Sequence, residues 1–313
     1  MKIEQELLAV SLSRFEYWAS PTLGRGQNRK KVLQMIGYID VGGGMRDIYG
    51  SGVLDRCIDD AVSFDCMIGV SAGAANVLSF LAGQRGRNYV FFHDYSFRKE
   101  YMSFGNFFRG HRFFNLDYVY NTLSGVGGEY PLDLIKAKEY DGLVNIVTTD
   151  GRSGEVKYFT LDDIRPNDFT VIKATCALPI FCKEQVIDGR VYFDGGLANP
   201  IPLDRAFELG CDKVVLTLTR PVAIHRNSVR DDRTARFIEH QYPAVAEALH
   251  NRAALYNETA DRALELQEEG KVLVIAPDDT CGVDTLKKTK EGLQALYDKG
   301  YADAAKIAEF VRG

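Results

Sequence analysis

The sequence predicts an α/β protein with a parallel sheet, and three observations support this class. Apolar runs at residues 31–40 and 64–69 each end in a glycine-containing turn, as buried strands do. Residues 47–60 have mostly helical spacing of apolar side chains, and residues 72–83 are small and apolar. The first half therefore alternates strand and helix, the order that gives a parallel sheet covered by helices.

Further strands follow in the second half of the chain. One hairpin is expected at residues 142–149 with 155–160, a second at 184–187 with 190–193, and a single strand at 213–219. The apolar run 271–277 interrupts the later, mainly helical pattern. Asp188-Gly189, between the strands of the second hairpin, is the strongest short turn signal in the chain. From about residue 230 the pattern is mainly helical, which predicts a helical C-terminal subdomain packed on the α/β core.

The composition excludes several classes of protein. The 313 residues are 46% hydrophobic and 26% charged, which is typical of a globular protein with one large domain, alone or with a subdomain. A net charge of −5 argues against nucleic acid as a partner. The six cysteines form no C-x-x-C pair and no histidine pair has metal-ligand spacing, so we expect reduced thiols, no metal and no cofactor.

Two apolar segments bear on the location of the protein. The N-terminal residues 1–18 carry charges and lack a signal-peptide core, which predicts a short amphipathic helix. Residues 66–84 are uncharged, but their polar side chains favour a buried strand, turn and helix over a membrane span. We expect a cytoplasmic protein, and peripheral contact with a membrane surface remains open.

The segment Gly69-Val70-Ser71-Ala72-Gly73 is a G-x-S-x-G motif between a predicted strand and a predicted helix. A serine hydroxyl attacks esters only when it is exposed and aligned with a base. A sharp strand-to-helix turn presents the hydroxyl, and the flanking glycines leave room for that turn. The amide of Ala72 would lie at a helix N-terminus and could stabilise an oxyanion. The alternative is a structural serine in an ordinary turn.

Two glycine motifs accompany the serine. Gly42, Gly43 and Gly44 precede Arg46 at a predicted helix start, and they suit an oxyanion hole, a phosphate cradle or a flexible turn. Asp194 follows a predicted strand and precedes two glycines, so it either projects into a cleft or belongs to a turn. Because Asp188-Gly189 already supplies the hairpin turn, Asp194 needs a different explanation.

Together these motifs resemble the patatin-like phospholipases, particularly the bacterial branch. The stretches that carry the resemblance are GGGMR-x-x-Y-x-x-GVLD, GVSAGA, KATCALPIF, and YFDGG followed by NPIPLDRA. The resemblance implies a three-layer α/β/α patatin-like sandwich with an N-terminal segment at 1–36, a catalytic domain at 37–220 and a mainly helical extension at 221–313.

The resemblance also implies roles for single residues. Ser71 matches the family nucleophile and Asp194 its catalytic base, while Gly42, Gly43, Gly44 and Arg46 match the oxyanion loop. The implied activity is carboxylic-ester hydrolysis of a lipid or simple acyl ester, as in a phospholipase, lysophospholipase or esterase of lipid degradation. Asp47 stands where the family usually has glycine. Its side chain would either narrow the loop or pair with Arg46.

Residues 85–120 hold 13 of the 35 aromatic side chains, with six arginines and lysines against three acids. Most of these rings suit core packing, and the segment as a whole is the best candidate for an acyl-binding wall or a lipid-contacting cap.

Two other functions stay open. One is an α/β-hydrolase with a Ser–His–Asp triad that uses His225, although the glycine loop lies only one strand–helix unit before Ser71. The other is a non-enzymatic lipid-binding protein that retains the fold, favoured only by Asp47.

Overall fold

The computed structural model describes residues 34–108, 112–165 and 167–313. The expected N-terminal helix falls in residues 1–33 and lies outside the described residues. Within the described ranges, no helix is both long enough and apolar enough to cross a membrane.

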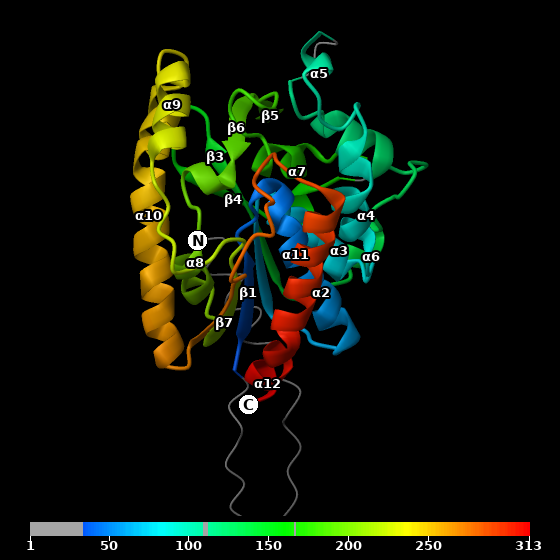
Figure 1. The fold of residues 1–313 in the computed structure, drawn as a ribbon, viewed down its shortest axis with the longest axis vertical. Coiled ribbons are helices and arrows are strands. Elements are labelled where there is room, and N and C mark those ends of the chain that lie inside the picture. Colours follow the sequence, from blue (N-terminus) through cyan, green and yellow to red (C-terminus); the bar gives the residue numbers. More distant parts are fainter. Residues whose placement is uncertain (1–33, 109–111, 166) are drawn as a thin grey trace, which may run out of the picture.

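One mixed sheet forms the centre of the molecule (Figure 1). Its strands are β1 (Ile36–Asp40), β2 (Cys66–Val70), β3 (Leu143–Asp150), β4 (Val156–Phe159), β5 (Gln185–Ile187), β6 (Arg190–Asp194), β7 (Lys213–Thr217) and β8 (Val272–Ile275). The strand order is β5-β6-β3-β2-β1-β7-β8, and β4 also pairs with β3. The neighbouring strands β3, β2, β1, β7 and β8 pair in parallel, whereas β4, β5 and β6 pair antiparallel. Both expected hairpins are present.

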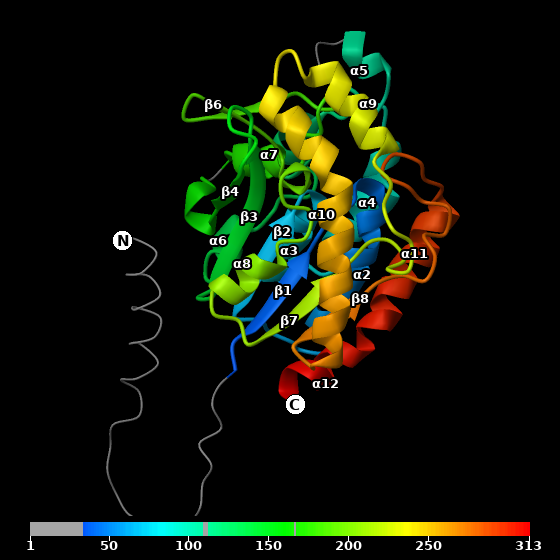
Figure 2. The ribbon, with the colours of Figure 1, turned by 90° about the vertical axis from the view of Figure 1, so that its left-hand side faces the viewer.

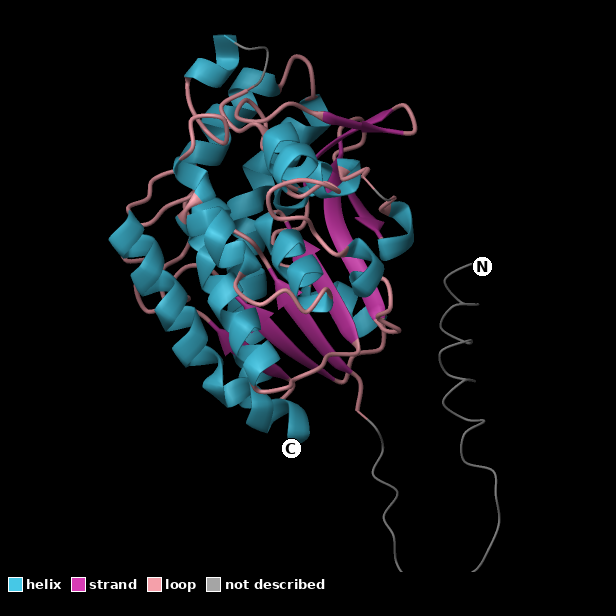
Figure 3. Cartoon of the chain, turned by 90° about the vertical axis from the view of Figure 1, so that its right-hand side faces the viewer, coloured by secondary structure: helices cyan, strands magenta, loops and turns pink. Residues whose placement is uncertain are grey.

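Helices cover both faces of this sheet (Figure 3). The helices are α2 (Ile48–Asp59), α3 (Ala72–Leu81), α4 (Arg87–His93), α5 (Gly105–Phe108), α6 (Leu134–Ala137), α7 (Thr170–Thr175), α8 (Leu203–Glu208), α9 (Val229–Ile238), α10 (Pro243–Glu268), α11 (Lys290–Asp303) and α12 (Ile307–Arg312). The long helix α10 runs along one face (Figure 2), and α2, α3 and α11 cover the other.

Side-chain alternation along the strands produces two apolar cores, one on each face. Tyr38 and Met67 pack with α2 and α3, whereas their neighbours Ile39 and Ile68 pack toward Tyr256 of α10. Because the central strands are buried on both faces, their sequences are nearly continuous apolar runs. The expected three-layer α/β/α fold is confirmed.

The C-terminal helices are present and are joined to the same sheet. Strand β8 pairs in parallel with β7. Helix α10 precedes β8 in the chain and α11 follows it, and these two helices cover opposite faces of the sheet. The C-terminal part therefore contributes to the central sheet and to both helical layers.

Helices α2 and α11 meet through two glycines. A Cβ atom at Gly52 would lie 2.3 Å from the carbonyl oxygen of Tyr297, and one at Gly300 would lie 2.1 Å from that of Tyr49. These distances are shorter than van der Waals contact, so the two backbones touch where any other residue would separate them.

This contact predicts that alanine at position 300 destabilises the protein, although alanine has the higher helix propensity. In an isolated helix, glycine to alanine stabilises by about 1 kcal/mol, but Gly300→Ala should lower the free energy of unfolding by about 1–3 kcal/mol through overpacking. Urea denaturation measures the change. Ala302→Gly, at an exposed position of α11, is the control and should cost about 1 kcal/mol from propensity alone. A stabilised Gly300→Ala protein would contradict the close contact.

Candidate active site

Ser71 lies in a strained turn between β2 and α3. Its φ of 56° and ψ of −129° place it in a region that residues with a Cβ rarely adopt. A Cβ at Gly69 would lie 2.4 Å from the Ala74 Cα, and one at Gly73 would lie 2.5 Å from the Asp40 carbonyl oxygen. Both glycines of the motif are therefore required by close backbone packing, and the turn presents the Ser71 side chain at the C-terminal edge of the sheet.

A threonine braces this turn. The Ser71 backbone N–H donates to Thr175 Oγ1 at 2.8 Å, and the Thr175 hydroxyl donates to the carbonyl oxygen of Val147 in β3. Thr175 belongs to the KATCALPIF stretch, but its role is not evident from the sequence because it lies more than one hundred residues from Ser71.

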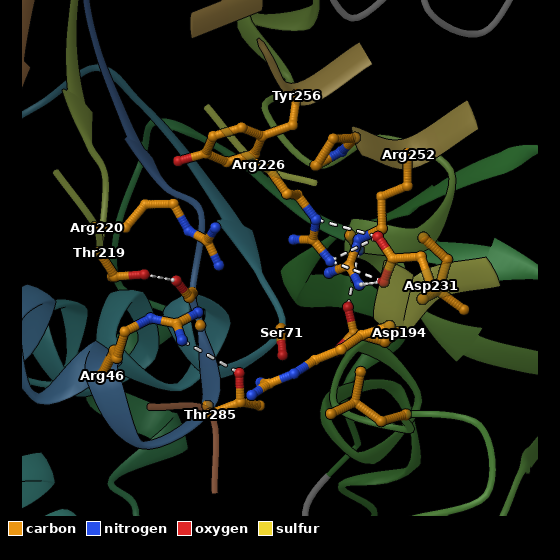
Figure 4. Close-up of a pocket in the computed structure, with 18 of the residues that line it drawn as sticks. Arg46, Ser71, Asp194, Thr219, Arg220, Arg226, Asp231, Arg252, Tyr256 and Thr285 are labelled. Carbon is orange, nitrogen blue, oxygen red and sulfur yellow. Dashed lines mark hydrogen bonds and ion pairs between the residues drawn. The ribbon is translucent and has the colours of Figure 1, made fainter. Parts of the chain in front are cut away.

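Asp194 ends strand β6 and is 1% exposed. Its Oδ1 accepts the Gly196 N–H at 2.8 Å, whereas Oδ2 makes no hydrogen bond within the described residues. Burial raises the pKa of the carboxyl group, while the cationic Arg252 and the adjacent Ser71 hydroxyl act to lower it. Ser71 and Asp194 therefore lie together, as the family resemblance implies (Figure 4).

The glycine loop packs against the serine turn. The Gly42 N–H donates to Asp40 Oδ1 at 3.0 Å, and the Gly42 carbonyl accepts the Thr219 hydroxyl at 2.5 Å. The N–H groups of Gly43, Gly44 and Ala72 make no hydrogen bond within the described part of the chain. Of the backbone donors expected to form an oxyanion hole, these three are free, whereas that of Gly42 is occupied.

Arg46 and Asp47 point in different directions. The Arg46 guanidinium pairs with Asp284 and approaches Thr285, which lie between β8 and α11. Asp47 is fully buried beneath the loop, beside Asp40. No ion pair joins Arg46 to Asp47 among the described residues, so Asp47 neither pairs with the arginine nor fills the cavity.

Asp40 and Asp47 form a buried pair of carboxyl groups, and neither carboxyl oxygen of Asp47 has a hydrogen-bond partner among the described residues. Burial and the adjacent Asp40 charge raise the pKa of Asp47 well above its ordinary value of 3.8. Asn76 Nδ2 also donates to Asp40, at 3.1 Å. Asp47 thus lies beside Asp40, the residue that accepts the Gly42 N–H.

His225 lines the same cavity as Ser71, but its ring pairs with an aspartate on α10. His225 Nε2 is 3.1 Å from Asp261 Oδ1 and the side chain is 61% exposed, while His250 pairs with Asp232. No histidine makes a hydrogen bond with Ser71 in the described ranges. His111 lies outside the described residues.

Two cavities of contrasting chemistry meet at Ser71. One, of about 710 Å³, contains Asp194, and its lining includes five arginines and three aspartates among glycines and apolar side chains. The other, of about 80 Å³, is apolar and is walled by Phe91, Phe92 and Tyr120 of the aromatic segment. Within the described part of the chain, no three histidine, cysteine, aspartate or glutamate side chains gather in a way that could hold a metal ion.

The profile of the family described as "Patatin-like phospholipase" matches residues 41–207, more than half of the chain. The chain belongs to the patatin-like phospholipase family. This domain places it in a family of lipid acyl hydrolases. A second profile, "Domain of unknown function (DUF6363)", matches residues 242–311, which include α10, β8 and α11.

Two comparisons with single proteins add context. Over 197 residues the chain is 29% identical to "Uncharacterized protein YjjU" of Escherichia coli (strain K12). The aligned region covers 59% of this chain and 52% of that protein. The chain thus spans about half the length of this curated relative. The crystal structure of VipD from Legionella pneumophila aligns with a TM-score of 0.41 and 12% identity over 88% of this chain and 67% of that chain.

The buried carboxyl pair makes a prediction about stability. A carboxyl group whose pKa is higher in the folded state than in the unfolded state binds more protons when folded, so stability falls as pH rises from about 3.8 toward the folded pKa. Asp47→Asn keeps the size and shape of the side chain and removes this titration. Its unfolding free energy should rise relative to the parent protein by up to about 1.4 kcal/mol per pH unit.

Urea unfolding at pH 5, 6 and 7 measures the difference. Asp162→Asn, at an exposed position, is the matched control. A difference between Asp47→Asn and the parent protein that stays constant across this range would mean that Asp47 does not hold the proton.

Proposed function

We propose that the protein hydrolyses acyl esters of lipids with a Ser71–Asp194 dyad. The observation that carries this proposal is the buried carboxyl of Asp194 facing a serine held at positive φ. A carboxylate is a weak base in water, and burial raises the pKa of Asp194 and makes it a stronger base. Membership of the lipid acyl hydrolase family supports the same reaction.

In the first half of the reaction, the Asp194 carboxylate takes the proton from the Ser71 hydroxyl while Oγ attacks the ester carbonyl carbon. The N–H groups of Gly43, Gly44 and Ala72 donate to the oxyanion that forms. As the tetrahedral intermediate collapses, the bond to the alcohol oxygen breaks and Asp194 returns the proton to the leaving alcohol. In the second half, water repeats these steps on the acyl-enzyme and releases the fatty acid.

The substrate class follows from the two cavities. The apolar cavity lies beside Ser71 and suits the acyl chain, because its walls combine aromatic rings with Leu116, Val119 and Leu178. The aromatic segment supplies this wall, and six of its thirteen rings also pack together in a local core. We infer that the chain binds a lipid or other acyl ester, with the acyl group directed toward the aromatic segment.

Three kinds of substitution separate the dyad from a triad. Ser71→Ala and Asp194→Asn should each reduce kcat/KM for a p-nitrophenyl ester by about 10⁴-fold or more, because the nucleophile and its base act as a unit. His225→Ala and His250→Ala should stay within a few-fold of the parent. Circular dichroism checks that each variant is folded. An inactive histidine variant alongside an active Asp194→Asn protein would establish the triad instead.

Fluorophosphonate labelling tests the competing non-enzymatic function. Such a probe should label Ser71 in the parent protein, and Ser71→Ala should abolish the label. A folded parent protein that does not react would favour a lipid-binding role without turnover.

The acyl cavity predicts a change in chain-length preference. Ala75, in α3, lines this cavity, so Ala75→Leu should shorten the space for the chain. Because each buried methylene contributes about 0.8 kcal/mol, kcat/KM for an octanoate ester should fall about 10-fold relative to the acetate ester. Ala302→Leu, at an exposed position of α11, should leave the ratio unchanged. Equal losses for both esters in Ala75→Leu would show that acyl chains bind elsewhere.

A further inference from the structure

We propose that arginines from the C-terminal part of the chain, with Arg220 as the principal donor, form a subsite beside Ser71 for an anionic phosphate group of the substrate, so that anionic acyl esters are preferred over neutral ones. This inference rests on the proposed hydrolase function and adds the class of head group to it.

Arginines from separate elements converge on this cavity (Figure 4). Arg46 follows the glycine loop, Arg220 and Arg226 follow β7, Arg230 lies on α9, and Arg252 lies on α10. All but Arg46 lie beyond the patatin-like match at residues 41–207, and Arg252 falls in the second match at 242–311. The C-terminal part therefore supplies most of the positive charge next to the candidate nucleophile.

The positive charge is only partly neutralised. Asp231 accepts two hydrogen bonds from Arg226 Nη2, at 2.8 and 2.9 Å, and lies 3.5 Å from Arg252. Asp284 pairs with Arg46 and Arg230. With Asp194 included, three aspartates face five arginines along the cavity, and Lys287 adds a further positive charge.

Among the arginines of this cavity, Arg220 pairs with no acidic side chain in the described residues. Within the described part of the chain it makes no hydrogen bond or ion pair, and its guanidinium carbon lies 5.6 Å from the Tyr256 ring centroid. Burial and the neighbouring Arg226 lower its pKa, although it stays cationic because an arginine pKa is ordinarily far above neutrality. Its donors are therefore available to a ligand.

Buried donors without partners surround the same space. Arg46 Nε, Arg252 Nε and the Tyr256 hydroxyl are buried and make no hydrogen bond within the described residues. Tyr256 is only 6% exposed and lines the cavity. Burial, together with neighbouring arginines, lowers the pKa of Arg46 and of Arg252 to about 10. Because unpaired buried donors and like charges destabilise a fold, such a cluster is typical of a binding site for an anion.

The chemistry of the cluster favours phosphate. Guanidinium groups donate in a planar fork that matches phosphate oxygens, and several forks around one cavity can bind one dianion. A head group with a quaternary ammonium would prefer an aromatic cage, whereas among the described lining residues the rings are those of Phe181, His225 and Tyr256. The cluster thus suits an anionic head group better than a zwitterionic one.

The positions of the two cavities complete the inference. Ser71, Gly44 and Leu178 line both cavities, so the ester would be attacked where the apolar and the basic spaces meet. A substrate bound there has its acyl chain on one side of the scissile bond and its anionic group on the other. An acyl glycerophosphate has this arrangement.

The test compares two esters that share one acyl chain. Oleoyl-lysophosphatidic acid and 1-oleoylglycerol are presented in the same neutral detergent micelles. Arg220→Gln should lower kcat/KM for the phosphate ester by about 10- to 100-fold, the range expected for hydrogen bonds to a charged group, and change the neutral ester by less than about 3-fold. Arg220→Lys should restore part of the loss, because it keeps the charge without the fork.

Arg262→Gln is the matched control, because it removes an arginine from α10 that pairs with Asp204 at the surface. It should leave both esters unchanged. Equal loss on the two esters in Arg220→Gln, or no loss on either, would overturn the subsite.

Inorganic phosphate separates a head-group site from a site for a free anion. Phosphate should compete with the lysophosphatidic acid and leave hydrolysis of the neutral ester unchanged, and an acceleration or inhibition of both esters would overturn the head-group assignment. Calorimetric titration of phosphate into the Ser71→Ala variant needs no turnover. Binding that is weakened at least 10-fold by adding Arg220→Gln supports the subsite even if the hydrolase function fails, and binding unaffected by that substitution overturns it.

Discussion

The site depends on the hydrogen-bond register of three neighbouring strands. Val70 of β2 is paired with Val147 of β3, and the next residue of β3, Thr148, is paired with Asp194 of β6. Ser71 and Asp194 therefore lie at the same level on either side of β3, about 10 Å apart in backbone position. A Cβ at Gly195 would lie 2.1 Å from the Val147 carbonyl oxygen, so this register requires the glycine that follows the aspartate.

Rigid support extends from this register to the glycine loop. Asp40, at the end of β1, holds the Gly42 amide, and Asp47 is buried beside Asp40, where burial and the Asp40 charge raise the pKa of Asp47. The free amides of Gly43 and Gly44 are thereby oriented before any ligand arrives, which is the condition for effective stabilisation of an oxyanion. A residue that departs from the family pattern, Asp47, supports the loop without entering the cavity.

The C-terminal helices connect the charge of the cavity with the chemistry of the dyad. Burial alone would raise the pKa of Asp194 and favour its neutral form, but Arg252 and Arg226 act in the opposite direction. The same arginines that we assign to head-group binding therefore help to keep the base ionised. In our proposal, a substrate phosphate would weaken this effect when bound, and the Gly196 hydrogen bond and the adjacent Ser71 hydroxyl would then contribute more to holding the charge on Asp194.

Local sequence was enough to predict the α/β class, seven of the eight strands and the two hairpins, because buried strands and tight turns leave their pattern in adjacent residues. Strand β8 shows in the sequence only as an apolar break in a helical region. That Ser71 and Asp194 belong to one site followed from the family resemblance of their motifs. Thr175, the Asp40–Asp47 pair and the cluster of Arg220, Arg226 and Arg252 were decided only by the tertiary structure. Their partners lie on different strands and helices, and an isolated arginine in a helical segment looks like any surface charge until folding buries it beside others.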